Sequence, residues 1–141
     1  MKKLFVVILT IVLILSSVGI CYGAVGDNMI SPYFVSVNYY LTQFNISSSG
    51  NATYAYDVVP RSYLNLNRVV ATVKIINSDT GAVAYNKTKE LEFDAMQYAF
   101  MDSGTYDLDT RGTYELRIML KCYKDNTLLE TINTTPDVAA F

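Results

Sequence analysis

Side chains that carry out acid–base or metal chemistry are scarce in this chain. The 141 residues include no histidine, and Cys122 is the only cysteine that follows Cys21. Most enzymatic general bases and many metal ligands are histidine, cysteine or paired carboxylates. Glu90 and Glu92 share one face of an expected strand, but lysines flank them and no pattern indicates the cleft that a glycosidase needs. We therefore rank an enzyme last among the function classes and expect no cofactor.

Three aspartates are the weak candidates for a cation site. They are Asp102, Asp107 and Asp109. Calcium takes several oxygen ligands, and the linear calcium loop fails here because Arg111 occupies a would-be ligand position and no closing glutamate follows. Aspartates that cap a solvated turn explain the same residues. We therefore expect no bound metal.

Tyrosine is unusually frequent, with 12 residues in the chain. Exposed tyrosine rings can stack on sugar faces or anchor a protein partner, although tyrosine also has a high strand propensity and fills half-buried positions. The rings that we expect to be most exposed are Tyr39, Tyr40, Tyr63 and Tyr123. Tyr63 is the best single candidate for a binding residue, because it lies in an expected loop at 60–67 with Arg61 beside it.

The start of the chain has the composition of a secretory signal peptide. Two lysines form a positive start, and Leu4–Leu15 is a long apolar stretch of the expected signal helix. A cut after Gly23 would follow small residues, as the signal peptidase requires. We therefore predict a signal peptide at 1–23 and a secreted protein. The short lysine pair is typical of a bacterial signal peptide, and the long apolar stretch fits a Gram-positive bacterium.

Two other fates of this segment are the alternatives to secretion. The apolar run Leu4–Ile20 is short for a membrane span, because a bilayer core requires about 20 apolar residues. A lipid anchor on Cys21 requires a small residue just before it, where the chain has isoleucine. Lipid anchoring through Cys21 and retention by an uncleaved signal therefore rank behind secretion, and no membrane span is expected after cleavage.

Removal of the signal leaves 118 residues, which is the length of one domain. We divide them into an extended segment at 24–33, a β-sandwich domain at 34–135 and a frayed tail at 136–141. The formal charge of this part is −4, from 9 basic and 13 acidic residues, and it holds no basic run. A mildly acidic surface argues against nucleic acid and anionic lipid as partners.

Strand patterns separated by turn residues recur along the chain. Between Tyr114 and Tyr123, apolar residues alternate with charged or polar ones at period two, which is typical of a half-buried strand. Cys122 lies on the apolar face, so we expect a buried thiol and a monomer. The expected strands are 34–41, 43–47, 52–59, 69–76, 82–93, 98–108, 112–123 and 128–134. Residues expected at the centre of the core are Val73, Ile75, Leu116, Ile118 and Leu120. This spacing predicts an all-β, antiparallel β-sandwich of seven to eight strands.

The segment Asp109–Tyr114 has the spacing of a tyrosine corner. In Greek-key sandwiches, a tyrosine near the start of strand F donates its hydroxyl proton to the backbone a few residues upstream. Gly112 permits the tight turn before Tyr114, and Asp109 can accept hydrogen bonds from amides of the loop. The motif assigns structural roles to these three residues and predicts an immunoglobulin-like or fibronectin-like sandwich.

Short segments of the chain resemble a group of small secreted single-domain proteins of Gram-positive bacteria to which no function is assigned. They are Ile30–Tyr33, Ile46–Ala52, Gly112–Arg117 and Tyr123–Asn126, the last followed by Glu130. The resemblance implies an immunoglobulin-like β-sandwich and implies no activity. The chain departs from the group because it has no tryptophan on the fourth strand, where Tyr85 stands instead.

These observations favour a secreted or cell-envelope-associated, non-catalytic binding or accessory domain. Its candidate partners are a cell-wall or extracellular protein or carbohydrate. A small exported toxin or bacteriocin-like protein is the alternative, because the size and the export signal permit it. Membrane-active bacteriocins are usually cationic or form an amphipathic helix, and an acidic strand protein does neither. The toxin therefore ranks second and the enzyme third.

Overall fold

The computed structural model of the protein describes residues 34–141, so the expected signal peptide and the segment 24–33 lie outside the described residues. Residues 34–141 form nine strands joined by turns, and none of them forms a helix long and apolar enough to cross a membrane. The strands are β1 (Val37–Ile46), β2 (Asn51–Pro60), β3 (Arg68–Asn77), β4 (Val83–Glu90), β5 (Glu92–Asp94), β6 (Ala99–Asp107), β7 (Thr113–Lys124), β8 (Thr127–Asn133) and β9 (Asp137–Ala140).

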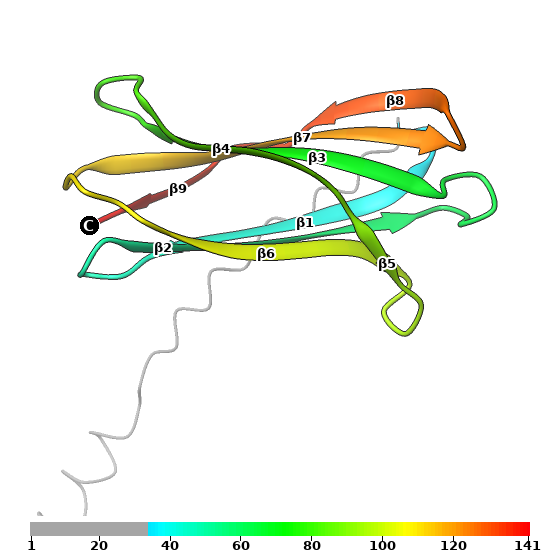
Figure 1. Ribbon diagram of the computed structural model, residues 1–141, viewed down its shortest axis with the longest axis horizontal. Helices are drawn as coiled ribbons and strands as arrows, with labels where there is room; N and C mark the ends of the chain where they lie inside the picture. Colours follow the sequence, from blue (N-terminus) through cyan, green and yellow to red (C-terminus); the bar gives the residue numbers. More distant parts are fainter. Residues whose placement is uncertain (1–33) are drawn as a thin grey trace, which may run out of the picture.

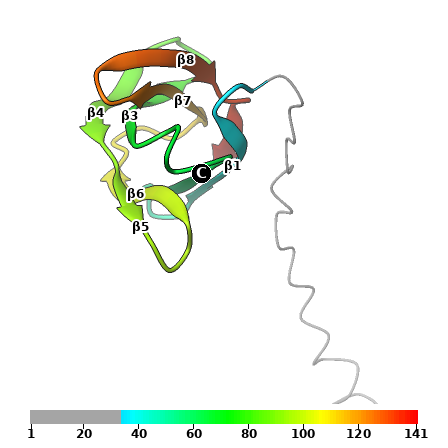
Figure 2. The same cartoon turned by 90° about the vertical axis from the view of Figure 1, so that its right-hand side faces the viewer.

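The strands form two antiparallel sheets that pack face to face (Figure 1, Figure 2). The first sheet has the order β1-β2-β6-β5, and the second sheet has the order β4-β3-β7-β8, with β9 also paired to β7. This is the immunoglobulin-like arrangement, in which strands A, B, E and D lie opposite strands C, F and G. The predicted fold class is confirmed, with nine strands in place of seven to eight.

The second sheet contributes the inward faces of β3 and β7 to the core, opposite buried side chains of β2 and β6. Period-two alternation along β3 and β7 directs every second side chain into the core. The residues predicted for the centre are all buried: Val73, Ile75, Leu116, Ile118 and Leu120. Burial of an apolar side chain of this size stabilises a fold by about 1.5–3 kcal/mol. This row therefore supplies much of the cohesion between the sheets.

The chain changes sheets at Leu91, within the segment predicted as one strand at 82–93. β4 pairs with β3 in the second sheet, whereas β5 pairs with β6 in the first sheet. The Leu91 side chain is buried, and its N–H donates to the Val69 carbonyl at 2.9 Å. A buried leucine between two polar, exposed strand ends therefore anchors the crossing, and one predicted strand becomes two.

The segment 136–141 is ordered by pairing, so the prediction of a frayed tail is wrong. β9 pairs with the first four residues of β7, on the same edge that β8 occupies further along. The Phe141 N–H donates to the Gly112 carbonyl, and the Gly112 N–H donates to the Phe141 carbonyl, both at 3.3 Å. The Phe141 ring packs on Tyr114, with 6.2 Å between ring centroids. Pro136 interrupts the edge strand without ending it.

The tyrosine corner has the geometry that its motif predicts. Tyr114 is buried, and its hydroxyl donates to the Thr110 carbonyl at 2.7 Å. Asp109 is exposed, and the carboxylate that approaches the backbone of the corner is Asp79, whose Oδ2 lies 3.4 Å from the Thr113 nitrogen. Asp79 therefore accepts the backbone hydrogen bond that was expected for Asp109. It can do so because the β3–β4 turn that contains Asp79 lies against the loop before β7.

Candidate functional site

Two loops at one end of the sandwich expose apolar side chains beside each other. One loop joins β2 to β3, and the other joins β5 to β6 (Figure 1). The exposed fractions are 39% for Tyr63, 81% for Leu64, 95% for Met96 and 46% for Tyr98. Together with Phe93, these four residues form a surface that we call the aromatic end. It contains the sequence-predicted binding residue Tyr63.

The rings of the aromatic end pack into one rigid group. The Tyr63 and Phe93 ring centroids are 4.2 Å apart, and Tyr98 meets Phe93 edge-on at 5.5 Å. The Tyr63 backbone N–H donates to the Tyr98 hydroxyl at 3.1 Å, which ties the two loops together. Edge-to-face and tilted ring pairs stabilise such clusters beyond the area that they bury. These contacts therefore hold the two loops together next to the exposed Leu64 and Met96.

The β5–β6 turn holds Met96 in an ordered position despite its exposure. Asp94 Oδ1 accepts hydrogen bonds from the Met96 N–H at 2.7 Å and the Gln97 N–H at 3.1 Å. Tyr98 has a φ of 52°, which is a costly backbone conformation for a large aromatic residue. Strained residues of this kind concentrate at functional sites. The turn therefore presents Met96 and Tyr98 in one fixed arrangement.

Arg61, the predicted neighbour of Tyr63, connects the β2–β3 loop to the beginning of β1. Its Nε donates to the Val37 carbonyl at 3.2 Å, and its backbone N–H donates to the Ser36 carbonyl at 2.9 Å. These bonds join the start of the β2–β3 loop to the beginning of β1. The residue is exposed, but its described bonds go to the backbone rather than to the aromatic end.

The other tyrosines predicted to be exposed make none of the ring contacts of the aromatic end. Tyr40 is buried, and its hydroxyl accepts a hydrogen bond from the Thr135 N–H at 3.3 Å, so the prediction for Tyr40 is wrong. A bulge between Val37 and Tyr39 sets the alternation of β1 so that Tyr40 faces inward. Tyr39 is half-buried on the outer face of the first sheet.

Tyr123, the last of the predicted tyrosines, lies on β7 in the second sheet. It is half-buried, and the guanidinium of Arg68 lies over its ring, 4.9 Å from the centroid. This cation–π contact covers one face of the ring. Tyr123 therefore does not add to the aromatic end, and its partner within the chain accounts for its position.

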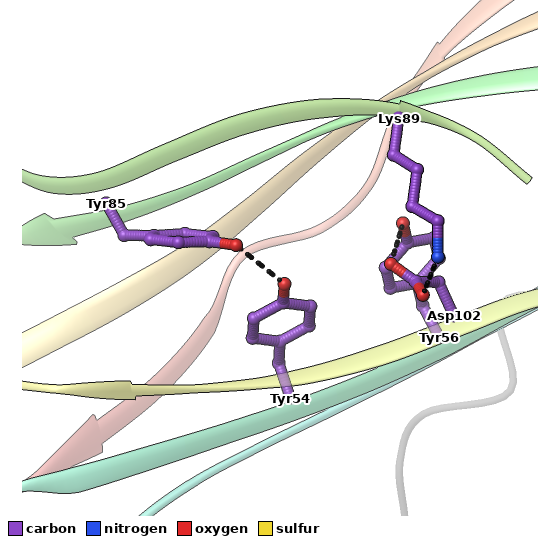
Figure 3. A network of polar contacts seen from close by, with 5 residues as sticks. All are labelled: Tyr54, Tyr56, Tyr85, Lys89 and Asp102. Atoms are coloured by element: carbon purple, nitrogen blue, oxygen red, sulfur yellow. Dashed lines mark hydrogen bonds and ion pairs between the residues drawn. The ribbon is translucent and has the colours of Figure 1, made fainter.

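A polar cluster closes the sandwich on the side where β4 passes over β6 (Figure 3). The buried Tyr54 of β2 places its hydroxyl 3.1 Å from the Tyr85 hydroxyl of β4. The Lys89 ammonium, also on β4, lies 2.7 Å from Asp102 Oδ1 on β6. The buried Tyr56 donates its hydroxyl proton to the second Asp102 oxygen at 3.5 Å. These contacts join the two sheets.

The titration behaviour of this cluster limits its chemistry. Burial raises the pKa of Tyr54, with the Tyr85 hydrogen bond as the next cause, and burial followed by the Asp102 charge raises the pKa of Tyr56. The hydrogen bond to Asp102 raises the pKa of the Lys89 ammonium. These directions favour neutral phenols at Tyr54 and Tyr56 and a charged ammonium at Lys89, and none of these forms acts as a base or nucleophile. The geometry suits a structural role.

The candidate metal ligands do not converge. Asp102 is engaged by Lys89 within the cluster, and Asp107 accepts a hydrogen bond from Asn51 Nδ2 at 2.7 Å. Asp109 is exposed beyond the end of β6. Within residues 34–141, no group of three or more Asp, Glu, Cys or His side chains could hold a metal ion.

Cys122 is buried on the inward face of β7 and is a free thiol among the described residues. Burial raises its pKa to about 12, and the charge of Glu130 contributes in the same direction. A thiol with this pKa is not a nucleophile at neutral pH, because the thiolate is the reactive form. The position fits the predicted small hydrophobic residue in the core.

Most residues of the aromatic end and of the polar cluster were not predicted from the sequence. Leu64 and Met96 lie in loops, and a period-two strand pattern gives no information on which loops meet at the same end of the sandwich. The polar cluster had a usable signal, because Tyr54 and Tyr56 share the inward parity of Ala52 in the β2 segment. Parity alone therefore places these hydroxyls between the sheets, where they require partners.

No family model and no curated protein matches the sequence. Among solved structures, the chain is similar to part of Bacteroides uniformis β-glucuronidase 2 covalently bound to cyclophellitol-6-carboxylate aziridine, with a TM-score of 0.46 and 19% identity over 74% of this chain. A calcium-binding mutant of the same enzyme matches with a TM-score of 0.43 and 21% identity over 69% of this chain. The match spans 13% of either β-glucuronidase chain.

The chain is also similar to the CARDB domain of a Pyrococcus furiosus protein in complex with di-metal ions. The TM-score is 0.38 and the identity 20%, over 71% of this chain and 79% of that chain. At these identities, the similarity to solved structures concerns the fold alone.

Proposed function

We propose that the protein is a secreted or cell-envelope-associated, non-catalytic binding or accessory domain, of the small type that the sequence resembles in Gram-positive bacteria. The aromatic end carries the proposal, because two loops joined by the Tyr63–Tyr98 hydrogen bond expose Leu64 and Met96 next to packed aromatic rings. Contiguous exposed apolar residues of this kind mark interaction sites. The signal-peptide pattern supports export. The buried Cys122 supports a monomer, since it cannot form a disulfide with a second copy without unfolding.

The partner that this surface fits best is a protein. A sugar ring stacks on an open aromatic face, but the Tyr63 ring packs on Phe93 at 4.2 Å and keeps only 39% of its surface exposed. Methionine and tyrosine are enriched at the centres of protein interfaces. The projecting Met96 and Leu64 side chains therefore suit insertion into pockets of a partner protein rather than stacking on carbohydrate.

Capture from the producer's culture medium and envelope extract tests this proposal. The wild-type protein is immobilised and compared with Met96→Asp and Leu64→Asp, which place a charge on the aromatic end without disturbing a packed side chain. Val138→Asp is the matched control, because Val138 is 63% exposed and lies on β9 beside the start of β7. We expect the first two variants to lose the captured protein and the control to retain it.

The treatment of the extract separates the partner classes. Protease digestion should abolish capture, whereas periodate oxidation of sugars should leave it intact. Capture that survives protease and fails after periodate would contradict a protein partner in favour of carbohydrate. Equal capture by the wild-type protein and all variants would show that the aromatic end is not the binding site. Growth inhibition of neighbouring strains by the purified protein would support the toxin alternative instead.

Fractionation of producing cells tests the proposed location. We expect the protein in the medium or loosely held at the envelope, without residues 1–23. A membrane-bound form with lipid on Cys21, or a form that retains the apolar segment, would contradict cleavage and release. These outcomes do not depend on the aromatic end, so location and binding are tested separately.

A further inference from the structure

The outer face of the second sheet contains a groove whose lining includes no residue of the aromatic end. Its volume is about 340 Å³. The residues that line it and matter here are Thr72, Lys74, Arg117, Met119, Asn133 and Pro136. They come from β3, β7, β8 and the link between β8 and β9. The groove therefore combines two cationic side chains with an apolar wall.

The groove lies where the edge strand is interrupted. β8 ends at Asn133 and β9 begins at Asp137, so the link between them leaves the regular ladder beside β7. At the break, the Thr134 N–H donates to the Ile118 carbonyl, and the Ile118 N–H donates to Thr134 Oγ1 at 3.3 Å. A side-chain hydroxyl thus replaces a backbone acceptor. Both backbone groups of Ile118 therefore have partners at the break, beside the groove.

The two cations of the groove oppose each other in the sheet. Lys74 of β3 and Arg117 of β7 are direct register partners, and both side chains are exposed on the outer face. Like charges directly opposite on neighbouring strands are destabilising. Among the described residues, Lys74 has no ion-pair partner, whereas Arg117 Nη2 lies 2.5 Å from Glu115 Oε1. Glu115 therefore neutralises Arg117 alone, and the Lys74 charge stays without a carboxylate partner among the described residues.

We propose that this groove binds an oxyanion, either a phosphoryl or a carboxylate group carried on a larger organic molecule. The guanidinium of Arg117 has five N–H donors, so the contact with Glu115 leaves donors for a second anion. Lys74 supplies a second positive charge on the facing strand. Met119 and Pro136 provide apolar surface for the rest of the ligand. A bound oxyanion would relieve the like-charge opposition.

Thermal unfolding in the presence of simple anions tests the site. Inorganic phosphate and acetate are the probes, each compared with sodium chloride at equal ionic strength. A ligand that binds only the folded protein raises the melting temperature with concentration. We expect at least one probe to do so in the wild-type protein, and the one that acts identifies the ligand group as phosphoryl or carboxylate.

Two charge variants separate the groove from a general salt effect. Lys74→Gln removes one of the facing cations, and the apparent affinity for the probe should fall by about tenfold or more, as expected for a lost charge-assisted hydrogen bond. Lys121→Gln is the control, because Lys121 lies on the same face of β7 but does not line the groove. It should keep the wild-type response.

A third variant predicts a gain rather than a loss. Glu115→Gln removes the carboxylate that competes for Arg117, so the probe should bind more tightly than in the wild-type protein. Without any probe, Lys74→Gln should melt at or above the wild-type temperature, because the like-charge opposition is gone. If the wild type, Lys74→Gln and Lys121→Gln respond equally to phosphate and acetate, the effect is a salt effect and the proposal is wrong.

Discussion

Tyr54 and Gly104 face each other directly across β2 and β6, and the Tyr54 ring lies over the place where a side chain at residue 104 would begin. A Cβ at that position would lie 2.5 Å from the Tyr54 hydroxyl oxygen and 2.6 Å from Cζ. Only glycine leaves room for the ring to cross β6 and bring its hydroxyl 3.1 Å from Tyr85. The polar cluster therefore depends on this glycine.

Replacement of Gly104 by alanine should displace the Tyr54 ring. We expect the free energy of unfolding to fall by about 1–3 kcal/mol, the usual cost of overpacking a well-filled interior. Urea denaturation measures the loss, with the outward-facing Ser103→Ala as the control. In a Tyr54→Leu background the cost of Gly104→Ala should shrink, because the clashing ring is absent. An equal cost in both backgrounds would contradict the steric explanation.

Replacement of Tyr114 by phenylalanine removes only the hydroxyl of the tyrosine corner. The bond from this hydroxyl to the Thr110 carbonyl measures 2.7 Å, and its loss should cost about 1 kcal/mol. Tyr106→Phe is a matched control, because Tyr106 is half-buried and its ring contact with Tyr85 does not require the hydroxyl. An unchanged melting temperature in Tyr114→Phe would show that the corner contributes nothing to stability.

Removal of residues 137–141 should destabilise the domain. The deletion takes away β9, its ladder with β7 and the Phe141 ring that packs on Tyr114. Phe141→Ala alone should cost about 1 kcal/mol or more through lost apolar contact. Val138→Ala, at a side chain that is 63% exposed, should change stability by less than about 0.5 kcal/mol. A deletion that melts like the full chain would restore the frayed-tail prediction.

Stability should decline at alkaline pH. The unfolded chain ionises its cysteine and tyrosines near their ordinary pKa values of 9.0 and 10.0, whereas folding raises the pKa of Cys122 to about 12 and raises those of Tyr54 and Tyr56. Groups with raised pKa values stabilise the fold fully below the unfolded pKa, and this contribution is lost as the pH rises toward the folded value. The unfolding free energy should therefore be steady near neutral pH and fall above about pH 9. Constant stability up to pH 11 would contradict the burial of these groups.

The fold was accessible from the sequence because period-two alternation is a local signal. The β3 and β7 segments each show it over ten or more residues, and the core residues that they predict are all buried. The departures arise where a tertiary contact overrides the pattern. Leu91 fills the core and carries the chain from one sheet to the other, and Phe141 secures β9 after Pro136 has interrupted the edge. Such contacts join segments that are distant in the chain, so a local sequence pattern cannot predict them.

The candidate site was accessible only in part. Tyr63 was identifiable because it stands in a loop, but its ring partner Phe93 lies on β5 and its hydrogen-bond partner Tyr98 lies 35 residues away in the chain. The error at Tyr40 has a simple physical cause. Adjacent residues on a strand point to opposite faces, so Tyr39 and Tyr40 could not both be exposed, and the bulge decides which of them faces inward.

The most direct test of the aromatic end as a binding site is the oxidation of Met96 by hydrogen peroxide. Its side chain is 95% exposed, so Met96 should be oxidised fastest in the free protein, whereas the half-buried Met101 and Met119 serve as internal references. In the presence of the captured partner fraction, we predict that oxidation of Met96 slows while that of both references is unchanged. Oxidation of Met96 at the same rate with and without the partner would contradict the proposed site.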